Sequence, residues 1–201
     1  SCDADYQQKR MEFITTLTPS TIVLHARLPL YLHGDGFNNS IGGVEPARSY
    51  YVGVTGKESY EERKKLFLNA FVDTVIQIID AGHKVVIISP VPTNGWHPVK
   101  RLMRISAIGN DPSIEYVRTK MAIPRRAVEL RQADIKSILQ DLEEKFSTVS
   151  VIDSLEILCD ASYCHSISES GAILYADRDH LSTIGASVLF FEFMSFLRSN
   201  E

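Results

Sequence analysis

The residues best suited to chemistry are an aspartate and a histidine three positions apart, directly before a helical pattern. They are Asp177 and His180, in the run Leu174-Tyr-Ala-Asp-Arg-Asp-His-Leu-Ser182. A histidine acts as a general base when a carboxylate accepts a hydrogen bond from its second ring nitrogen, because this bond fixes the tautomer of the imidazole. The competing interpretation is a surface turn capped by Ser182. The spacing alone favours that turn, because short motifs often occur by chance.

Two of the three cysteines indicate the cellular compartment. Cys159 and Cys164 flank a loop-like stretch, and Cys2 lies near the first residue. A zinc site would need two further ligands, and only His165 is near, so no metal is expected. The spacing favours a disulfide between Cys159 and Cys164, which implies an oxidising compartment, with two reduced thiols as the alternative. Cys2 is then left over, which suggests that a partner residue is missing.

The composition describes an ordinary globular chain. Its 201 residues, 44% of them hydrophobic, suit one domain with a core large enough to fold without a metal or a disulfide. The net charge of -4 argues against non-specific binding to nucleic acid. A basic cluster at Lys100, Arg101 and Arg104 is expected to be a solvated face. No apolar stretch approaches the roughly 20 residues of a membrane helix, and no cofactor is predicted.

Helical and strand patterns alternate along the chain, with no internal repeat. Apolar periodicity predicts helices over residues 7–17, 59–81, 124–146 and 183–197, and short apolar runs predict strands over 21–26, 84–89 and 149–152. Residues 29–56 and 93–123 are long connections between them. The alternation predicts an α/β sandwich with a mainly parallel sheet, whose active site lies beyond the C-terminal ends of the strands.

Several other side chains are weaker candidates. His25 is expected in the core, while His33 and His97 lie in long loops and could line a cleft. Trp96 could stack on a sugar ring, but covering the edge of the core is the safer interpretation. The run Gly109-Asn110-Asp111 is interpreted as turn chemistry.

The block that ends the chain resembles a known family. Residues Asp177 to Ala186, with the pattern Asp-x-Asp-His-Leu-Ser-x-x-Gly-Ala, are similar to the terminal block of SGNH hydrolases. The resemblance is strongest to the SGNH domains fused to acyltransferase family 3 membrane proteins of bacteria. It extends over nearly the whole chain. Further matches are the Cys-x4-Cys of Cys159 and Cys164, the Pro-Val-Pro turn of residues 90–92, and an Arg-Trp-like pair followed by tyrosine, here Arg27-Leu28 and Tyr31.

The resemblance implies a Ser-His-Asp triad in which Asp177 orients His180 and His180 activates a serine. In the family this serine lies in a Gly-Asp-Ser segment at the end of the first strand. No Gly-Asp-Ser occurs here, since Gly34-Asp35 is followed by glycine. We therefore expect the first strand and its serine to precede Ser1. Ser89, at a strand end, is a less favoured nucleophile.

The resemblance also implies the fold and a candidate for stabilising negative charge. Residues 1–201 are expected to be the C-terminal part of an SGNH (flavodoxin-like) three-layer sandwich that lacks its N-terminal strand. The asparagine of the family's oxyanion hole has no match. Arg27, together with Tyr31, is the candidate to face developing negative charge. A structural ion pair of Arg27 is equally compatible with its position.

By resemblance, the chain is expected to be an enzyme that transfers an acyl group, most simply acetyl, to a cell-envelope carbohydrate such as lipopolysaccharide. The location would be the periplasmic or extracytoplasmic face of a bacterial inner membrane. The implied partners are a membrane acyltransferase domain, in the same native polypeptide, and a glycan acceptor, but no nucleic acid. The alternatives are a stand-alone carbohydrate esterase and a catalytically inactive glycan-binding module. The sequence does not separate these alternatives, because the first shares the triad and the second shares the fold.

Overall fold

The computed structural model describes residues 4–45, 58–108 and 112–199. Cys2 and the run Gly109-Asn110-Asp111 lie outside these residues. The chain divides into two compact units, which are described in turn. The expectation of one SGNH-like domain over residues 1–201 stays a prediction. The first unit comprises Ser1–Asp35, Arg48–Pro90 and Asp134–Ile152, and the second comprises Gly36–Ala47, Val91–Ala133 and Asp153–Glu201.

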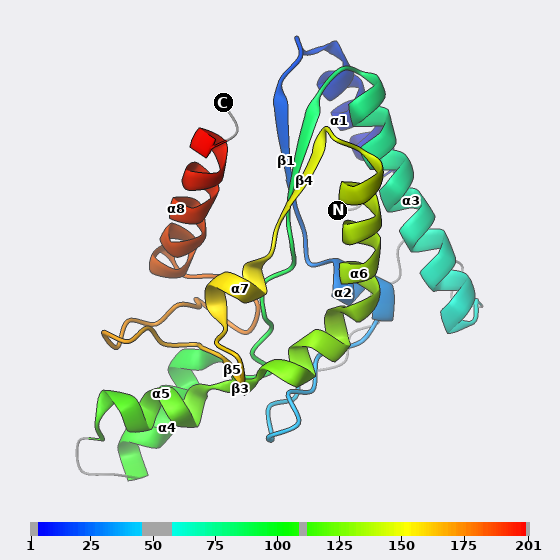
Figure 1. The fold of residues 1–201 in the computed structure, drawn as a ribbon. Helices are drawn as coiled ribbons and strands as arrows, with labels where there is room; N and C mark the ends of the chain where they lie inside the picture. The colour runs from blue at the N-terminus through cyan, green and yellow to red at the C-terminus, as the bar shows by residue number, and fades with distance from the viewer. Residues whose placement is uncertain (1–3, 46–57, 109–111, 200–201) are drawn as a thin grey trace. The chain divides into compact units, whose positions relative to one another are not determined.

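The first unit contains a parallel three-stranded sheet (Figure 1). Its strands are β1 (Thr21–His25), β2 (Lys84–Ile88) and β4 (Val149–Ile152), in the order β1-β2-β4. Val23 pairs with Val86, and Val86 pairs with Ser150. All three strands lie where the apolar runs predicted them, and the parallel sheet is confirmed. Among the described residues, β1 pairs with a neighbour on one edge only.

Three helices of the first unit follow the predicted pattern: α1 (Ala4–Thr16), α3 (Tyr60–Asp80) and the part of α6 (Arg125–Lys145) that begins at Asp134. A further helix, α2 (Leu28–His33), was not predicted, because it lies in the stretch 29–56 that was expected to be a connection. Ser59 caps α3 through a capping box, in which its hydroxyl accepts from the Glu62 N–H and the Glu62 carboxylate accepts from the Ser59 N–H. Gly82 follows α3 with a φ of 88°, a left-handed conformation that glycine adopts without strain.

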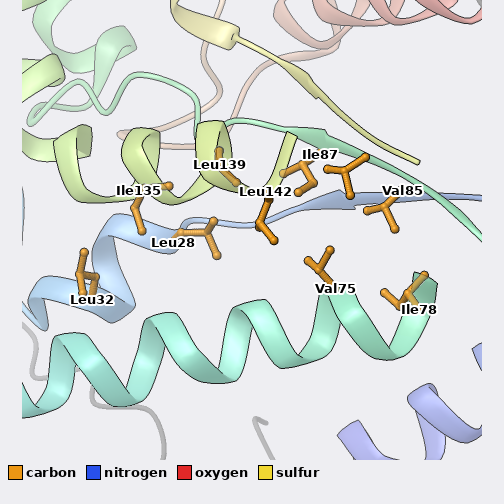
Figure 2. Packing of buried hydrophobic residues seen from close by; sticks show 10 residues of the cluster. Leu28, Leu32, Val75, Ile78, Val85, Ile87, Ile135, Leu139 and Leu142 are labelled. Atoms are coloured by element: carbon orange, nitrogen blue, oxygen red, sulfur yellow. The ribbon is translucent and has the colours of Figure 1, made fainter. Parts of the chain in front are cut away.

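The core of the first unit lies between one face of the sheet and these helices. Val85 and Ile87 of β2 point toward side chains from α3 and from α6 (Figure 2). The residues of α6 recur every three or four positions, as expected for one face of a helix. The buried members of this cluster are Leu28, Leu32, Val75, Ile78, Val85, Ile87, Ile135, Leu139, Leu142 and Val149.

The second unit is built from shorter elements and two small cores. Its helices are α4 (Pro98–Ile108), α5 (Ile114–Met121), the start of α6, α7 (Ser154–Leu158) and α8 (Thr183–Ser199). Two short strands, β3 (Ile123–Pro124) and β5 (Tyr163–Cys164), pair antiparallel. One core gathers around Phe37, Ile123 and Leu155, and the other around Ile105, Val117, Met121 and Ile167. Among the described residues, none of the helices combines the length and apolarity needed to cross a membrane.

Two further expectations about the fold are wrong. Residues 93–123 form helices α4 and α5 rather than one long connection. Each helix is short, so its apolar period is brief, and its stability comes from packing in the second small core. His25 is exposed rather than in the core. It is the last residue of β1, where alternate side chains face away from the helices.

We expect Ile78→Ala in α3 to lower the free energy of unfolding by about 2–5 kcal/mol, because it removes fully buried carbon atoms and leaves a cavity. Leu66→Ala on the same helix is the matched control. Leu66 is 51% exposed, and exposed substitutions usually change this free energy by about 0.5 kcal/mol or less. Urea denaturation followed by circular dichroism measures both. Equal losses would contradict the core face assigned to α3.

Candidate active site

Asp177 and His180 lie in a tight loop of the second unit. The loop is closed by an antiparallel bridge between Tyr175 and Leu181. Within it, the Ala176 N–H donates a hydrogen bond of 2.8 Å to the His180 carbonyl. The side chain of Tyr175, the first residue of the loop, is fully buried and so anchors the start of the loop.

The start of α8 fixes the other end of this loop. The Ser182 hydroxyl accepts a bond of 3.1 Å from the Gly185 N–H and donates one of 2.7 Å to the Ile173 carbonyl. Ser182 is therefore the N-cap of α8. A Cβ atom on Gly185 would lie 2.0 Å from the Leu174 carbonyl oxygen, so no larger residue fits this contact. The serine and the glycine of the terminal block thus position the loop that carries Asp177 and His180.

The side chains of Asp177 and His180 are hydrogen-bonded to each other. His180 Nδ1 lies 3.0 Å from Asp177 Oδ1 and 2.9 Å from Oδ2. Asp177 Oδ1 also accepts from the backbone N–H of Asp179, at 3.0 Å, and of His180, at 2.8 Å. The imidazole is 74% exposed and the carboxylate 43% exposed. The carboxylate is thus held by the backbone of its own turn, while the imidazole remains accessible to a reactant.

The hydrogen bonds to Asp177 determine which nitrogen of His180 can act as a base. Partial burial raises the pKa of the Asp177 carboxyl, but bonds from two backbone N–H groups and from the imidazole outweigh this effect and lower it to about 2. The carboxylate is therefore ionised at neutral pH and can only accept, so Nδ1 must donate. In the neutral imidazole, Nε2 then carries the lone pair. A general base in a Ser-His-Asp triad requires this tautomer.

The same turn contains the potential metal ligands that the described residues bring together. Ligand atoms of Asp177, Asp179 and His180 all lie within 4.8 Å of one another. Asp179 Oδ2 is 3.7 Å from His180 Nδ1, beyond hydrogen-bonding distance. Because both oxygens of Asp177 already lie at hydrogen-bonding distance from Nδ1, we assign these residues to an Asp–His pair rather than to a metal centre.

Three further site candidates belong to the first unit. Arg27 occupies the N-cap position of α2, and Tyr31 lies within that helix; both are partly buried. Ser89 directly follows β2 and is buried, and its N–H donates a bond of 2.9 Å to the Ile152 carbonyl. The catalytic roles expected for Arg27, Tyr31 and Ser89 stay predictions.

A second Asp–His pair joins Asp160, inside the loop that the Cys159–Cys164 disulfide closes, to His165, directly after that loop. His165 Nε2 is 2.7 Å from Asp160 Oδ2, and the His165 side chain is only 12% exposed. Asp160 also accepts from the N–H groups of Ser162 and Tyr163. These bonds, with that of His165, lower the pKa of the Asp160 carboxyl to about 2. We interpret this pair as structural, because its imidazole is shielded and it holds the disulfide loop.

The second unit also contains a cavity of about 220 Å³ that the sequence did not reveal as a site. We call it the basic pocket. The solvated face expected at Lys100, Arg101 and Arg104 is part of its wall, and Arg178 of the Asp177–His180 loop is another part. Of the two histidines expected to line a cleft, His97 lines this pocket. His33 instead stacks on Tyr60 in the first unit. The lining residues are Gly42, Gly43, Val44, Gly95, Trp96, His97, Lys100, Arg101, Arg104 and Arg178.

Comparisons with known proteins show the fold and the family of the chain. Among solved structures, the periplasmic domain of a lipopolysaccharide acetyltransferase from Salmonella ser. Paratyphi A is similar in fold, with a TM-score of 0.64 and 16% identity. The match covers 96% of this chain and 62% of that structure, so the chain spans less than two thirds of it. A comparison with curated proteins found no match. The model of the family described as the SGNH domain fused to AT3 domains matches residues 1–194, and the chain therefore belongs to that family.

Proposed function

We propose that this chain is part of an enzyme that transfers an acyl group, most simply acetyl, to a hydroxyl of a cell-envelope carbohydrate on the periplasmic side of the membrane. The observation that carries the proposal is the hydrogen bond between the exposed imidazole of His180 and the ionised carboxylate of Asp177. Membership of a family fused to AT3 domains supports a membrane acyltransferase domain in the same native polypeptide as the source of the acyl group. The Cys159–Cys164 disulfide suits an oxidising compartment.

The proposed reaction has two halves, with His180 Nε2 moving a proton in each. In the first half, a serine Oγ attacks the carbonyl carbon of the acyl donor while Nε2 takes the hydroxyl proton. The bond between the acyl group and its carrier then breaks, and the carrier leaves with that proton. In the second half, Nε2 takes a proton from the acceptor hydroxyl, whose oxygen attacks the acyl-serine. The ester to serine breaks, and Nε2 returns the proton to Oγ.

We propose that the nucleophilic serine lies on a further strand that pairs with the open edge of β1. Among the described residues, β1 pairs with β2 alone, so the N–H and C=O groups along its other edge are available to another strand. In a parallel sheet such a strand would end beside the C-terminal end of β1. A serine at its end would therefore lie where parallel sheets place their reactive groups.

Arg27 is the proposed contact for the oxyanion of this reaction. It follows β1 by two residues and precedes α2, so it lies at the C-terminal end of the edge strand. A guanidinium there would face the negative charge that develops on the acyl carbonyl oxygen. Tyr31, one turn along α2, is proposed to contact the substrate from the same helix.

We expect His180→Ala, in the native polypeptide together with its membrane domain, to reduce acyl transfer to the cell-envelope glycan by about three orders of magnitude or more, because a triad without its base retains only binding and electrostatic catalysis. Acetate esters on the glycan, quantified by mass spectrometry, measure the transfer. The matched control is His165→Ala, which removes the imidazole of the shielded Asp–His pair. Equal activity of the His180→Ala variant and the wild type would contradict the proposed base.

The location of the serine has its own test. We expect the 201-residue chain alone to hydrolyse small acetyl esters no faster than its Ser89→Ala variant, because the proposed nucleophile is not among these residues. The release of p-nitrophenol from its acetate ester measures hydrolysis. Robust hydrolysis that is lost in Ser89→Ala would place the nucleophile after β2 and contradict the added strand.

Hydrolysis by the native polypeptide with water as the preferred acceptor would identify an esterase rather than a transferase.

The low pKa of Asp177 predicts the pH dependence of the pair. The carboxyl pKa is lowered from 3.8 to about 2, so this group stabilises the folded state fully above pH 4 and loses that contribution as the pH falls toward 2. We therefore expect the acid limb of the activity profile to show no ionisation of Asp177 near pH 4. Carbon-13 chemical shifts of the Asp177 carboxyl measure its pKa directly. A midpoint near 4 would contradict the hydrogen-bonded turn.

A further inference from the structure

The basic pocket is a built cavity rather than a gap between mobile side chains. The Asn39 side chain ties together the two loops that bound it, accepting from the Gly43 N–H at 2.8 Å and donating to the Asn94 carbonyl at 2.8 Å. Asn39 and Asn94 are both fully buried. Gly95 has a φ of 74°, and a Cβ atom on it would lie 2.7 Å from the Gly43 carbonyl oxygen. The two loops that bound the pocket therefore touch backbone to backbone, which requires glycine at this contact.

The pocket brings four cationic side chains together. Lys100, Arg101, Arg104 and Arg178 line it, and none of them forms an ion pair with a carboxylate in the part of the chain that the structure describes. Their proximity is unfavourable, because like charges repel more strongly where water is partly excluded. An anion in the pocket would remove this repulsion.

Two arginines of the pocket each have one guanidinium nitrogen shielded from solvent. The Nε atoms of Arg101 and Arg178 are buried and have no hydrogen-bond partner among the residues that the structure describes. The guanidinium carbon of Arg101 lies 4.7 Å from the centroid of the Trp96 ring, which holds the side chain over an aromatic face. The pocket thus orders its cations in advance, which lowers the entropic cost of binding an anion.

The pocket adjoins the Asp177–His180 pair through Arg178. This residue lies between Asp177 and His180 in the same tight loop, and its carbonyl accepts a bond of 2.7 Å from the Asn94 N–H. The Asn94 carbonyl in turn accepts from the Asn39 side chain, which ties together the two loops that bound the pocket. The loop that carries the proposed base is therefore tied directly to the wall of the pocket.

We propose that the basic pocket binds an anionic group of the acceptor glycan, a phosphate or a carboxylate carried by a sugar, and so presents a neighbouring hydroxyl to His180. The anion site stands on the geometry of the pocket, whereas its assignment to the acceptor rests on the proposed acyl transfer. Arginine is suited to this role because its planar fork matches the oxygens of phosphate and carboxylate. Trp96, which shares the cavity, supplies an aromatic face of the kind that packs against sugar rings.

The volume of the cavity and the net charge of the protein favour a glycan over a nucleic acid as the ligand. A cavity of about 220 Å³ is smaller than the roughly 300–1,000 Å³ of a pocket for a drug-sized ligand, so it suits one charged sugar unit. The chain as a whole carries a net charge of -4, which repels a long polyanion. A single pocket also differs from the extended basic stripe that follows a nucleic acid backbone.

The protein contains its own reporter for this site, because Trp96 is the one tryptophan of its sequence and lines the pocket. Titration of the 201-residue chain with inorganic phosphate, glucose 6-phosphate and glucuronate, followed by tryptophan fluorescence, measures binding without any need for catalysis. We expect saturable changes with these anions and none with glucose at equal concentration. The affinity should fall as sodium chloride rises, because salt screens the attraction. The sugar phosphate and the uronate then distinguish which anionic group is preferred.

Variants test whether the pocket arginines carry the binding. We expect Arg101→Gln combined with Arg178→Gln to weaken anion binding by at least about tenfold, the loss typical of hydrogen bonds to charged groups. The matched control is Arg126→Gln, which removes an exposed cation of the second unit outside the pocket. If the double variant fails to fold, Lys100→Gln with Arg104→Gln, both exposed residues, gives the same test with a smaller expected loss.

Three results would overturn the inference. Equal responses to glucose and to the anions would show that charge does not select the ligand. Unchanged affinity in the pocket variants would place the anion elsewhere. Tighter binding of a single-stranded oligonucleotide than of any sugar anion would assign the pocket to another class of ligand. Failure of acyl transfer with anion binding intact would instead overturn only the proposed function, so the two failures are distinguishable.

Discussion

The contact between the first turn of α8 and the Leu174 carbonyl is the constraint on which the candidate site depends. Gly185 permits this contact because it has no side chain, and Ser182 secures it with two hydrogen bonds. Together they fix the point at which the loop ends. Because the loop contains only a few residues between Tyr175 and Leu181, fixing both ends leaves Asp177 little freedom. The geometry of the pair, and with it the tautomer of His180, follows from a packing contact that itself performs no chemistry.

The two Asp–His pairs of the second unit show that residue types alone do not define a base. Both carboxylates accept backbone N–H groups of their own turn, and both have a pKa lowered to about 2. They differ in the exposure of the imidazole, which is 74% for His180 and 12% for His165. They also differ in the ring nitrogen that meets the carboxylate, Nδ1 for His180 and Nε2 for His165. Access to a reactant, together with the ring nitrogen that does not meet the carboxylate, separates the proposed base from the structural pair.

How far the sequence predicted each feature depends on the separation of the residues that form it. The Asp177–His180 pair and the cap at Ser182 arise from residues three apart, so their geometry is determined by one turn and was predictable from the motif. The strands of the parallel sheet were predictable because buried strands are continuous apolar runs. The basic pocket was not predictable, because it joins residues 42–44, 95–104 and 178. Helices α4 and α5 were missed for a related reason, since their stability comes from contacts with Ile167, far along the chain.

Two neighbouring charged residues of the terminal block, Asp177 and Arg178, have different partners. Asp177 turns inward to its own backbone and to Nδ1, while Arg178, the next residue, contributes to the wall of the basic pocket. Consecutive side chains in a tight loop point in different directions, so a carboxylate and a guanidinium can lie side by side in sequence without forming an ion pair. Had they paired, Arg178 would compete with the imidazole for the Asp177 carboxylate and would also be lost to the pocket. Keeping them apart leaves one charge to orient the base and the other to attract a substrate.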